Sequence, residues 1–342
     1  MLRDMLFGVQ QTDTDSYLVV PCNGTPATSS YKQVGETLTS LGALPSSAGF
    51  NASSYQGGVS KDGKYFAYGI NASPYVMIYK QEAGVFTKLA NPATLPPSTV
   101  YGVAMSPDGV YMACAHTGGG WLTIYKRSGD TFTKLSVTSS LAATCNGCVF
   151  SSDGTYLAVT TNNSPYVAVF KRSGDTFTEL TALTGVGGTG YGVAFSPDTT
   201  HLCIGTGTTP YINIFKRSGD TFTKLPDPSA MVGFCPAMSF TADGTYLACS
   251  HNSSPMATVY KRNGDTFTKL SDIPSPATSG QGNGCSFNKA GDLLTVSYTS
   301  TAPFVNVYKR TGDTFTKLPN LSITYSNTTA SPMFLPPPNF GV

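Results

Sequence analysis

One decapeptide, Lys-Arg-Ser-Gly-Asp-Thr-Phe-Thr-Lys-Leu, recurs along the chain at a nearly constant interval. Its first lysine stands at positions 80 (in a looser copy), 126, 171, 216, 261 and 309, so the steps are 46, 45, 45, 45 and 48 residues. A period of roughly 40–50 residues is typical of propellers and solenoids, in which each repeat is one supersecondary unit. This repeat constrains the fold more than any other feature of the sequence.

Two further motifs precede the decapeptide at fixed distances. The first reads Gly-Val-Ala-Phe-Ser-Pro-Asp at 192–198, and the second reads Thr-Tyr-Leu-Ala-Val at 155–159. Both keep their spacing in the N-terminal segment, where Tyr17 lies nine residues after Gly8 and 14 residues before Tyr31. The chain therefore contains seven repeats, of which the first is degenerate. They start near residues 8, 56, 102, 147, 192, 237 and 284.

Each repeat offers four strand candidates, which we call a, b, c and d in chain order. Pro-Asp-Gly between strands a and b and Ser-Gly-Asp between strands c and d are tight-turn signatures, because Pro fixes φ, Asp bonds back to the backbone and Gly accepts positive φ. Strands a, b and c are apolar on consecutive residues, which indicates that both faces are covered. The turn aspartates, which we expect to cap backbone N–H groups, are Asp62, Asp108, Asp153, Asp198 and Asp243.

These patterns predict an all-β fold, a seven-bladed β-propeller of four-stranded antiparallel blades with about 45–48 residues per repeat. We expect the propeller to span 1–323 and an extended, Pro-rich tail to span 324–342. Glycine and alanine at the start of strand a suit the crowded axis of such a ring. A β-solenoid is the alternative fold.

The pattern Ser-Pro-Asp-Gly-x-Tyr-Leu-Ala, followed by the decapeptide, resembles the WD40-like propeller repeats of bacteriophage and prophage proteins over about residues 8–320. The chain departs from WD40 repeats at large, because it has no Trp-Asp dipeptide and its single tryptophan is Trp121. The resemblance implies a virion-associated propeller on the tail, fibre or head surface.

Histidines and cysteines are the candidates for chemistry. His116 and His251 occupy equivalent positions three repeats apart, so a shared metal ion is not expected, and His201 replaces a strand-b tyrosine. Cys145 and Cys148 form a Cys-x-x-Cys, but the repeat aligns them with a glycine and a valine of the next repeat, which favours buried, reduced thiols. We therefore expect no catalytic residue, no cofactor and no metal site.

The lysine–arginine pairs of the decapeptide form a regular basic set. A ring that binds phosphate or acidic glycans is one reading. The other is that the aspartate three or four residues later neutralises each pair across its own hairpin, which the net charge of +2 favours. The pairs are Lys126-Arg127, Lys171-Arg172, Lys216-Arg217, Lys261-Arg262 and Lys309-Arg310.

Binding is expected in the irregular parts of the chain, since variable loops on a rigid scaffold usually carry it. These are the inter-repeat segments, such as 136–146 and 181–191, and the tail. The predicted partner-binding residues of the tail are Pro332, Met333, Phe334, Leu335, Pro336, Pro337, Pro338 and Phe340. Ring closure stays open: 8–41 looks like a whole first blade, and 321–328 is an alternative closing strand.

The predicted function is that of a non-enzymatic bacteriophage structural or adhesion protein, assembled in the host cytoplasm without a signal peptide and located in the virion. Expected partners are other virion proteins, in a homo-oligomer or symmetric array, and a host-surface glycan or protein. Nucleic acid binding and membrane insertion are not expected. The alternatives are a carbohydrate- or protein-binding propeller outside a virion and a lactonase-like hydrolase.

Overall fold

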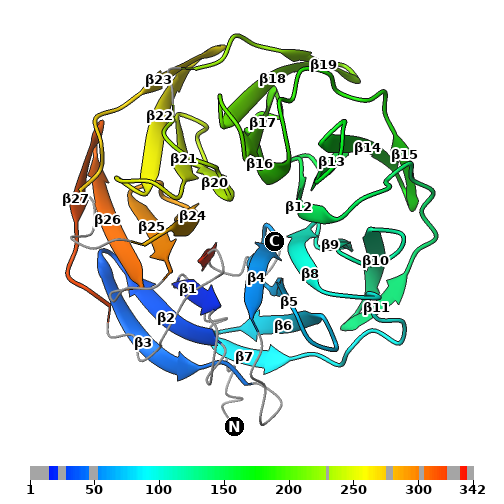
Figure 1. Cartoon of the computed structure of the whole chain (residues 1–342). Coiled ribbons are helices and arrows are strands. Elements are labelled where there is room, and N and C mark those ends of the chain that lie inside the picture. The colour runs from blue at the N-terminus through cyan, green and yellow to red at the C-terminus, as the bar shows by residue number, and fades with distance from the viewer. Residues whose placement is uncertain are drawn as a thin grey trace, which may run out of the picture.

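The computed structural model is a ring of seven four-stranded antiparallel sheets around a central axis (Figure 1). It describes residues 15–21, 28–45, 53–228, 231–274, 280–299, 304–321 and 332–336. The described residues form strands, turns and loops and include no helix, so none that could span a membrane. The prediction of a seven-bladed all-β propeller is confirmed.

The strands of each blade run from the axis outward in the order a, b, c, d. Blade two contains β4 (Ser54–Val59), β5 (Tyr65–Ile70), β6 (Val76–Glu82) and β7 (Val85–Lys88). Blade three contains β8 (Val100–Met105), β9 (Tyr111–His116), β10 (Leu122–Ser128) and β11 (Thr131–Lys134). Blade four contains β12 (Cys145–Phe150), β13 (Tyr156–Thr161), β14 (Val167–Ser173) and β15 (Thr176–Glu179).

The next three blades repeat this pattern. Blade five contains β16 (Gly190–Phe195), β17 (His201–Thr206), β18 (Ile212–Ser218) and β19 (Thr221–Lys224). Blade six contains β20 (Ala237–Phe240), β21 (Tyr246–Ser250), β22 (Ala257–Asn263) and β23 (Thr266–Lys269). Blade seven contains β24 (Gly282–Phe287), β25 (Leu293–Tyr298), β26 (Val305–Thr311) and β27 (Thr314–Lys317).

Blade one is built from both ends of the chain. Its outer strands are β1 (Ser16–Pro21), β2 (Thr28–Val34) and β3 (Thr37–Ala43), and its innermost strand is β28 (Met333–Leu335), antiparallel to β1. The expectation of a whole first blade at 8–41 is therefore corrected, because β28 occupies the place of strand a. The segment 8–14 and most of the alternative closing segment 321–328 lie outside the described residues.

The a–b turn is held by the side chains that its sequence supplies. In blade three the Asp108 carboxylate accepts hydrogen bonds from the Ser106 hydroxyl and from the Val110 backbone N–H at 3.0 Å, and Gly109 adopts a φ of 65°. Equivalent bonds recur at Asp153, Asp198 and Asp243. The predicted capping role of these aspartates is confirmed.

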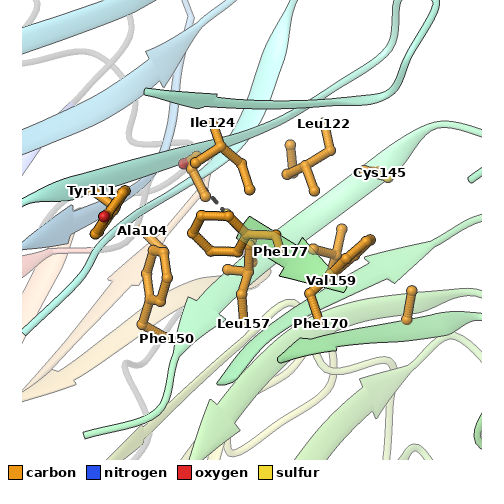
Figure 2. Packing of buried hydrophobic residues seen from close by; sticks show 14 residues of the cluster. Ala104, Tyr111, Leu122, Ile124, Cys145, Phe150, Leu157, Val159, Phe170 and Phe177 are labelled. Atoms are coloured by element: carbon orange, nitrogen blue, oxygen red, sulfur yellow. Dashed lines mark hydrogen bonds between the residues drawn. The ribbon is translucent and has the colours of Figure 1, made fainter. Parts of the chain in front are cut away.

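The core is divided into seven clusters, each between two neighbouring blades. Figure 2 shows the cluster between blades three and four, where Ile124 of β10 faces Leu157 of β13 and Phe177 of β15 packs beside Tyr111 of β9. Because every blade contributes to two clusters, its first three strands are covered on both faces. This explains why those strands carry consecutive apolar residues rather than alternating ones.

The charges of the decapeptide join one blade to the next. Lys126 on β10 contacts Asp175 of the next blade at 2.7 Å, and the Tyr111 hydroxyl donates to the same carboxylate at 2.5 Å. Lys171 reaches Asp220 and Lys216 reaches Asp265 in the same way. The prediction that the aspartate of the same hairpin neutralises each lysine is thus wrong for these lysines. In the hairpin of blade three, Lys126 stands opposite Thr133, and Asp130 lies at the turn.

Candidate functional site

Two cavities lie along the propeller axis, one on each side of Gln56. The upper cavity, of about 510 Å³, lies where the innermost strands begin. It is lined by Tyr55, Gln56, Tyr101, Thr117, Thr144, Asn146, Asn162, Tyr191, Pro236 and Asn283. The lower cavity, of about 610 Å³, follows the innermost strands to the a–b turns and also contacts Gln56.

The upper cavity is lined by neutral, aromatic and amide side chains. Tyr55 and Tyr101 meet edge to face with their ring centroids 4.7 Å apart. The Asn146 amide donates to Asn162 Oδ1 and to the Gly190 carbonyl, both at 2.7 Å, so its orientation is fixed. Burial, reinforced by Tyr101, raises the pKa of Tyr55, which keeps this phenol protonated and able to donate at neutral pH.

Several of the lining residues come from one structural position in different blades. Tyr55, Tyr101, Asn146, Tyr191 and Asn283 each begin or closely follow the start of an innermost strand. The chain varies this position from blade to blade, while the next position is glycine or alanine in blades three to seven. Variation at one position of a ring creates an asymmetric site on a nearly symmetric scaffold.

The lower cavity has a different chemistry. Its walls carry apolar side chains from the innermost strands, including Val103, Val149, Met238 and Met333. Lys61, which is exposed, lies at its rim near the a–b turns. The side chains along the channel therefore change at Gln56, from tyrosines and amides above it to aliphatic side chains, serines and one lysine below it.

Some of the tail residues predicted to bind a partner line the lower cavity. Met333, Phe334 and Leu335 are buried as β28, and Met333 and Phe334 line the lower cavity. Pro332 and Pro336 flank the strand, whereas Pro337, Pro338 and Phe340 lie outside the described residues. In this structure the tail's partner is the chain's own first blade, because β1 needs an inner neighbour for its backbone.

The histidines are packed among the blades, and none of them lines the upper cavity. His116 and His251 each place Nε2 3.0 Å from a threonine hydroxyl, that of Thr123 and Thr258 respectively. Burial lowers the pKa of both imidazoles to about 4, so both are neutral at pH 7. His201 lies 2.9 Å from Asp265 of the next blade, in the place of the tyrosine that other blades use.

The Cys-x-x-Cys thiols are free and buried in β12. Burial raises the pKa of Cys148 to about 12 and raises that of Cys145 further above its ordinary value. Neither thiol is ionised at neutral pH, so the predicted structural role fits them better than a redox or nucleophilic one.

The upper cavity was missed in the sequence, although a signal was present. The variable inter-repeat segments were expected to carry binding, and two of them end at Asn146 and Tyr191. The structure places these last residues, rather than the middles of the segments, at the cavity. An alignment of the repeats around the glycine of strand a would have revealed the ring of unequal residues.

Comparison with known proteins gives the fold. No protein-family model and no curated protein matches the sequence. Among solved structures, the periplasmic gluconolactonase of Pseudomonas aeruginosa superposes with a TM-score of 0.74 at 15% identity, over 95% of this chain and 100% of that one. A provisionally assigned 6-phosphogluconolactonase of Bacteroides fragilis gives 0.73 at 14%, over 95% and 99%.

A WD40 propeller is also similar. The Swd1 β-propeller domain of Myceliophteria thermophila superposes with a TM-score of 0.62 at 13% identity, over 80% of this chain and 87% of that domain. At these identities the likenesses establish the seven-bladed propeller fold alone.

The comparisons contradict the prediction of a non-enzymatic bacteriophage structural protein. The structures that match almost the whole chain include proteins named as lactonases, which are enzymes, and nothing links the chain to a phage or a virion. The Ser-Pro-Asp-Gly and decapeptide motifs explain the error, since in this structure they form turns and inter-blade contacts, which build the scaffold and do not specify a function. The expected partners, homo-oligomer and location stay predictions.

Proposed function

We propose that the protein is a lactonase-like hydrolase that binds a neutral sugar lactone in the upper cavity. The observation that carries this proposal is the lining of that cavity, where tyrosine rings and amide side chains meet at the start of the innermost strands. The similarity in fold to proteins named as gluconolactonase and 6-phosphogluconolactonase supports the reaction class.

The lining suits a polyhydroxy ring. Aromatic faces such as those of Tyr55 and Tyr101 pack against the apolar C–H face of a sugar, and the amides of Asn146, Asn162 and Asn283 can pair with its hydroxyl groups. The ten lining residues are all neutral, so an uncharged lactone fits better than a phosphorylated one, which would need cationic partners.

The proposed reaction is the hydrolysis of an activated cyclic ester. Water adds to the lactone carbonyl carbon, the ring C–O bond breaks, and the proton lost by water ends on the released alkoxide, giving a hydroxy acid. In this proposal the protonated Tyr55 hydroxyl, which belongs to a residue of the cavity lining, donates to the oxyanion that forms on the carbonyl oxygen. The residues thus supply orientation and oxyanion stabilisation.

The test is hydrolysis of δ-gluconolactone by the full chain, measured as acid release above the spontaneous rate. We expect catalysis with this lactone and weaker catalysis with its 6-phosphate. Tyr55→Phe should lower kcat/KM by about tenfold to a hundredfold, because one oxyanion donor is removed. Tyr211→Phe, which removes a hydroxyl outside the lining, should leave kcat/KM unchanged.

Carbohydrate binding without hydrolysis is the second candidate, and the neutral lining favours it. Calorimetry with gluconolactone and with glucitol separates the two candidates. Binding of both compounds without acid release would replace the hydrolase by a binding protein. No binding and no acid release would contradict both candidates.

A further inference from the structure

Gln56 breaks the symmetry of the propeller at the level where the two cavities of its channel meet. At the equivalent position Gly102, Gly147, Gly192 and Gly284 stand in blades three, four, five and seven, and Ala237 stands in blade six. The position needs a small residue in several blades: a Cβ on Gly102 would lie 2.7 Å from the Gly147 Cα. Blade two alone, among the six blades whose residue here is described, places a long side chain at this level.

The Gln56 side chain crosses the axis. Its Nε2 donates to the Pro236 carbonyl of blade six at 2.5 Å. Its Oε1 lies beside Gly147 of blade four, since a Cβ added to this glycine would lie 3.2 Å from that oxygen. Blade six lies across the ring from blade two, and blade four is two blades away from blade two (Figure 1). A side chain that contacts both of them spans the channel.

Gln56 lines both cavities and is therefore their common boundary. Above it lie Tyr55, Tyr101 and the amides, and below it lie Val103, Val149 and Met333. We infer that Gln56 is a specificity-determining residue, which forms the floor of the upper cavity and limits its ligands to compact polar rings. This inference rests on the proposed function in its choice of ligand.

The inference predicts what its removal would admit. With a small residue at position 56 the two cavities would join, and a ring bound between the tyrosines could extend an alkyl chain downward along Val103 and Met333. Each CH₂ of an apolar chain that is buried there would raise the affinity by about fourfold. The variant should accept lactones with a hydrocarbon tail that the wild-type protein rejects.

The experiment compares Gln56→Ala with the full wild-type chain. Alanine is chosen because Ala237 already occupies this level. The probe is a tetrahydropyran that carries a hexyl chain, a cyclic ether that cannot be hydrolysed, and binding is measured by calorimetry. We expect at least a tenfold gain in affinity in Gln56→Ala. The matched control is Gln33→Ala, which also removes an amide that donates to a backbone carbonyl, that of Gly35, on an outer hairpin.

The outcomes separate the two proposals. Thermal unfolding shows whether Gln56→Ala folds. If it folds and gains no affinity for the hexyl ether, Gln56 is not the floor of the upper cavity, even where δ-gluconolactone is hydrolysed. If it gains affinity while neither protein hydrolyses δ-gluconolactone, the role of Gln56 as the floor is supported and the proposed hydrolase function is wrong. Gln56→Asn, whose shorter amide no longer reaches Pro236, should gain affinity to an intermediate degree; an unchanged affinity in both variants overturns the inference.

Discussion

At the scale of single residues, the blades differ most in the polar groups that they bury. His116 in blade three and His251 in blade six occupy positions where blades four and five carry Thr161 and Thr206. Both imidazoles are fully buried. Their environment favours the neutral form, so protonation must work against folding.

The two histidines predict a loss of stability in mild acid. Their pKa falls from an ordinary value of 6.5 to about 4 in the folded state, so between these pH values the unfolded chain binds more protons. The stability that the neutral rings allow is complete above pH 6.5 and is lost as the pH falls towards 4. Each histidine contributes a loss on the order of 3 kcal/mol.

The measurement is the free energy of unfolding in urea from pH 7 to pH 4. The double variant His116→Thr, His251→Thr carries the residue of the sister blades and should show a shallower decline over this range. Parallel curves for the variant and the wild-type protein would show that carboxylates alone set the acid response.

Asn213 on β18 is a second buried polar group with a testable consequence. Its side chain is 0% exposed, and neither its Oδ1 nor its Nδ2 forms a hydrogen bond within the described residues. An unsatisfied buried amide costs about 1–3 kcal/mol, whereas an apolar group of the same shape avoids that cost. Asn213→Leu should therefore raise the free energy of unfolding by roughly 1 kcal/mol.

Thermal and urea unfolding of Asn213→Leu measure this gain. Asn306 occupies the equivalent place in blade seven but donates to the Tyr308 hydroxyl at 3.3 Å, so Asn306→Leu should destabilise the protein. A loss of stability in Asn213→Leu as large as in Asn306→Leu would indicate that Asn213 has a partner, such as an internal water.

At the scale of the element, the outer hairpin explains why one decapeptide is repeated. Its lysine reaches the aspartate of the next blade, and its arginine stacks on the strand-b ring of the blade before: Arg172 lies 4.8 Å from the Tyr111 centroid. Its phenylalanine packs in the same seam, that is, the contact zone between two neighbouring blades, since Phe177 meets Tyr111 edge to face with the ring centroids 5.6 Å apart. Each copy is thus half of two inter-blade contacts.

The contact of lysine, aspartate and tyrosine between neighbouring blades uses other residues at three places in the ring. His201 replaces the tyrosine between blades five and six, and Glu36 replaces the aspartate between blades seven and one, where it lies 2.6 Å from Lys309. Between blades one and two, Gly84 stands at the aspartate position, and a Cβ there would lie 2.6 Å from the Tyr17 hydroxyl. The seam between blades one and two therefore lacks the carboxylate that joins the others.

The contact between blades three and four can be tested at Tyr111. Burial, together with the hydrogen bond to Asp175, raises the pKa of Tyr111 to about 12, so the hydroxyl donates at every physiological pH. Tyr111→Phe should cost about 1 kcal/mol, because the lost bond goes to a charged acceptor that is partly screened by solvent.

A double-mutant cycle with Asp175→Ala isolates this bond from the loss of ring packing. The two changes should be less than additive in the free energy of unfolding. Full additivity would mean that the tyrosine acts through its ring alone.

At the scale of the whole molecule, the repeat predicted the ring but not its closure or its site. The periodicity alone predicts seven blades, because each repeat forms one blade whose outer hairpin makes the same contacts with its neighbours. The site depends on residues such as Tyr55 and Gln56, whose importance arises only when unequal strands converge on one axis. The closing strand is three residues long, and its pairing with β1 spans almost the whole chain, so no local pattern marks it.

We expect closure of the ring to depend on β28 more than on β3, the outermost strand of the same blade. Leu335 pairs with Tyr17 and is 0% exposed in the cluster between blades one and two, the seam that lacks the carboxylate contact. Leu335→Ala should therefore lower the free energy of unfolding by about 2–5 kcal/mol, the usual cost of truncating a buried leucine. Leu41→Ala, on β3 of the same blade and 46% exposed, should change it by less than about 0.5 kcal/mol. Urea unfolding of both variants decides the matter, and hydrogen exchange locates the effect: Leu335→Ala should first expose the amides of β1 and β4. Equal losses in the two variants, or exposure spread evenly over the seven blades, would mean that the ring does not depend on this strand for its closure.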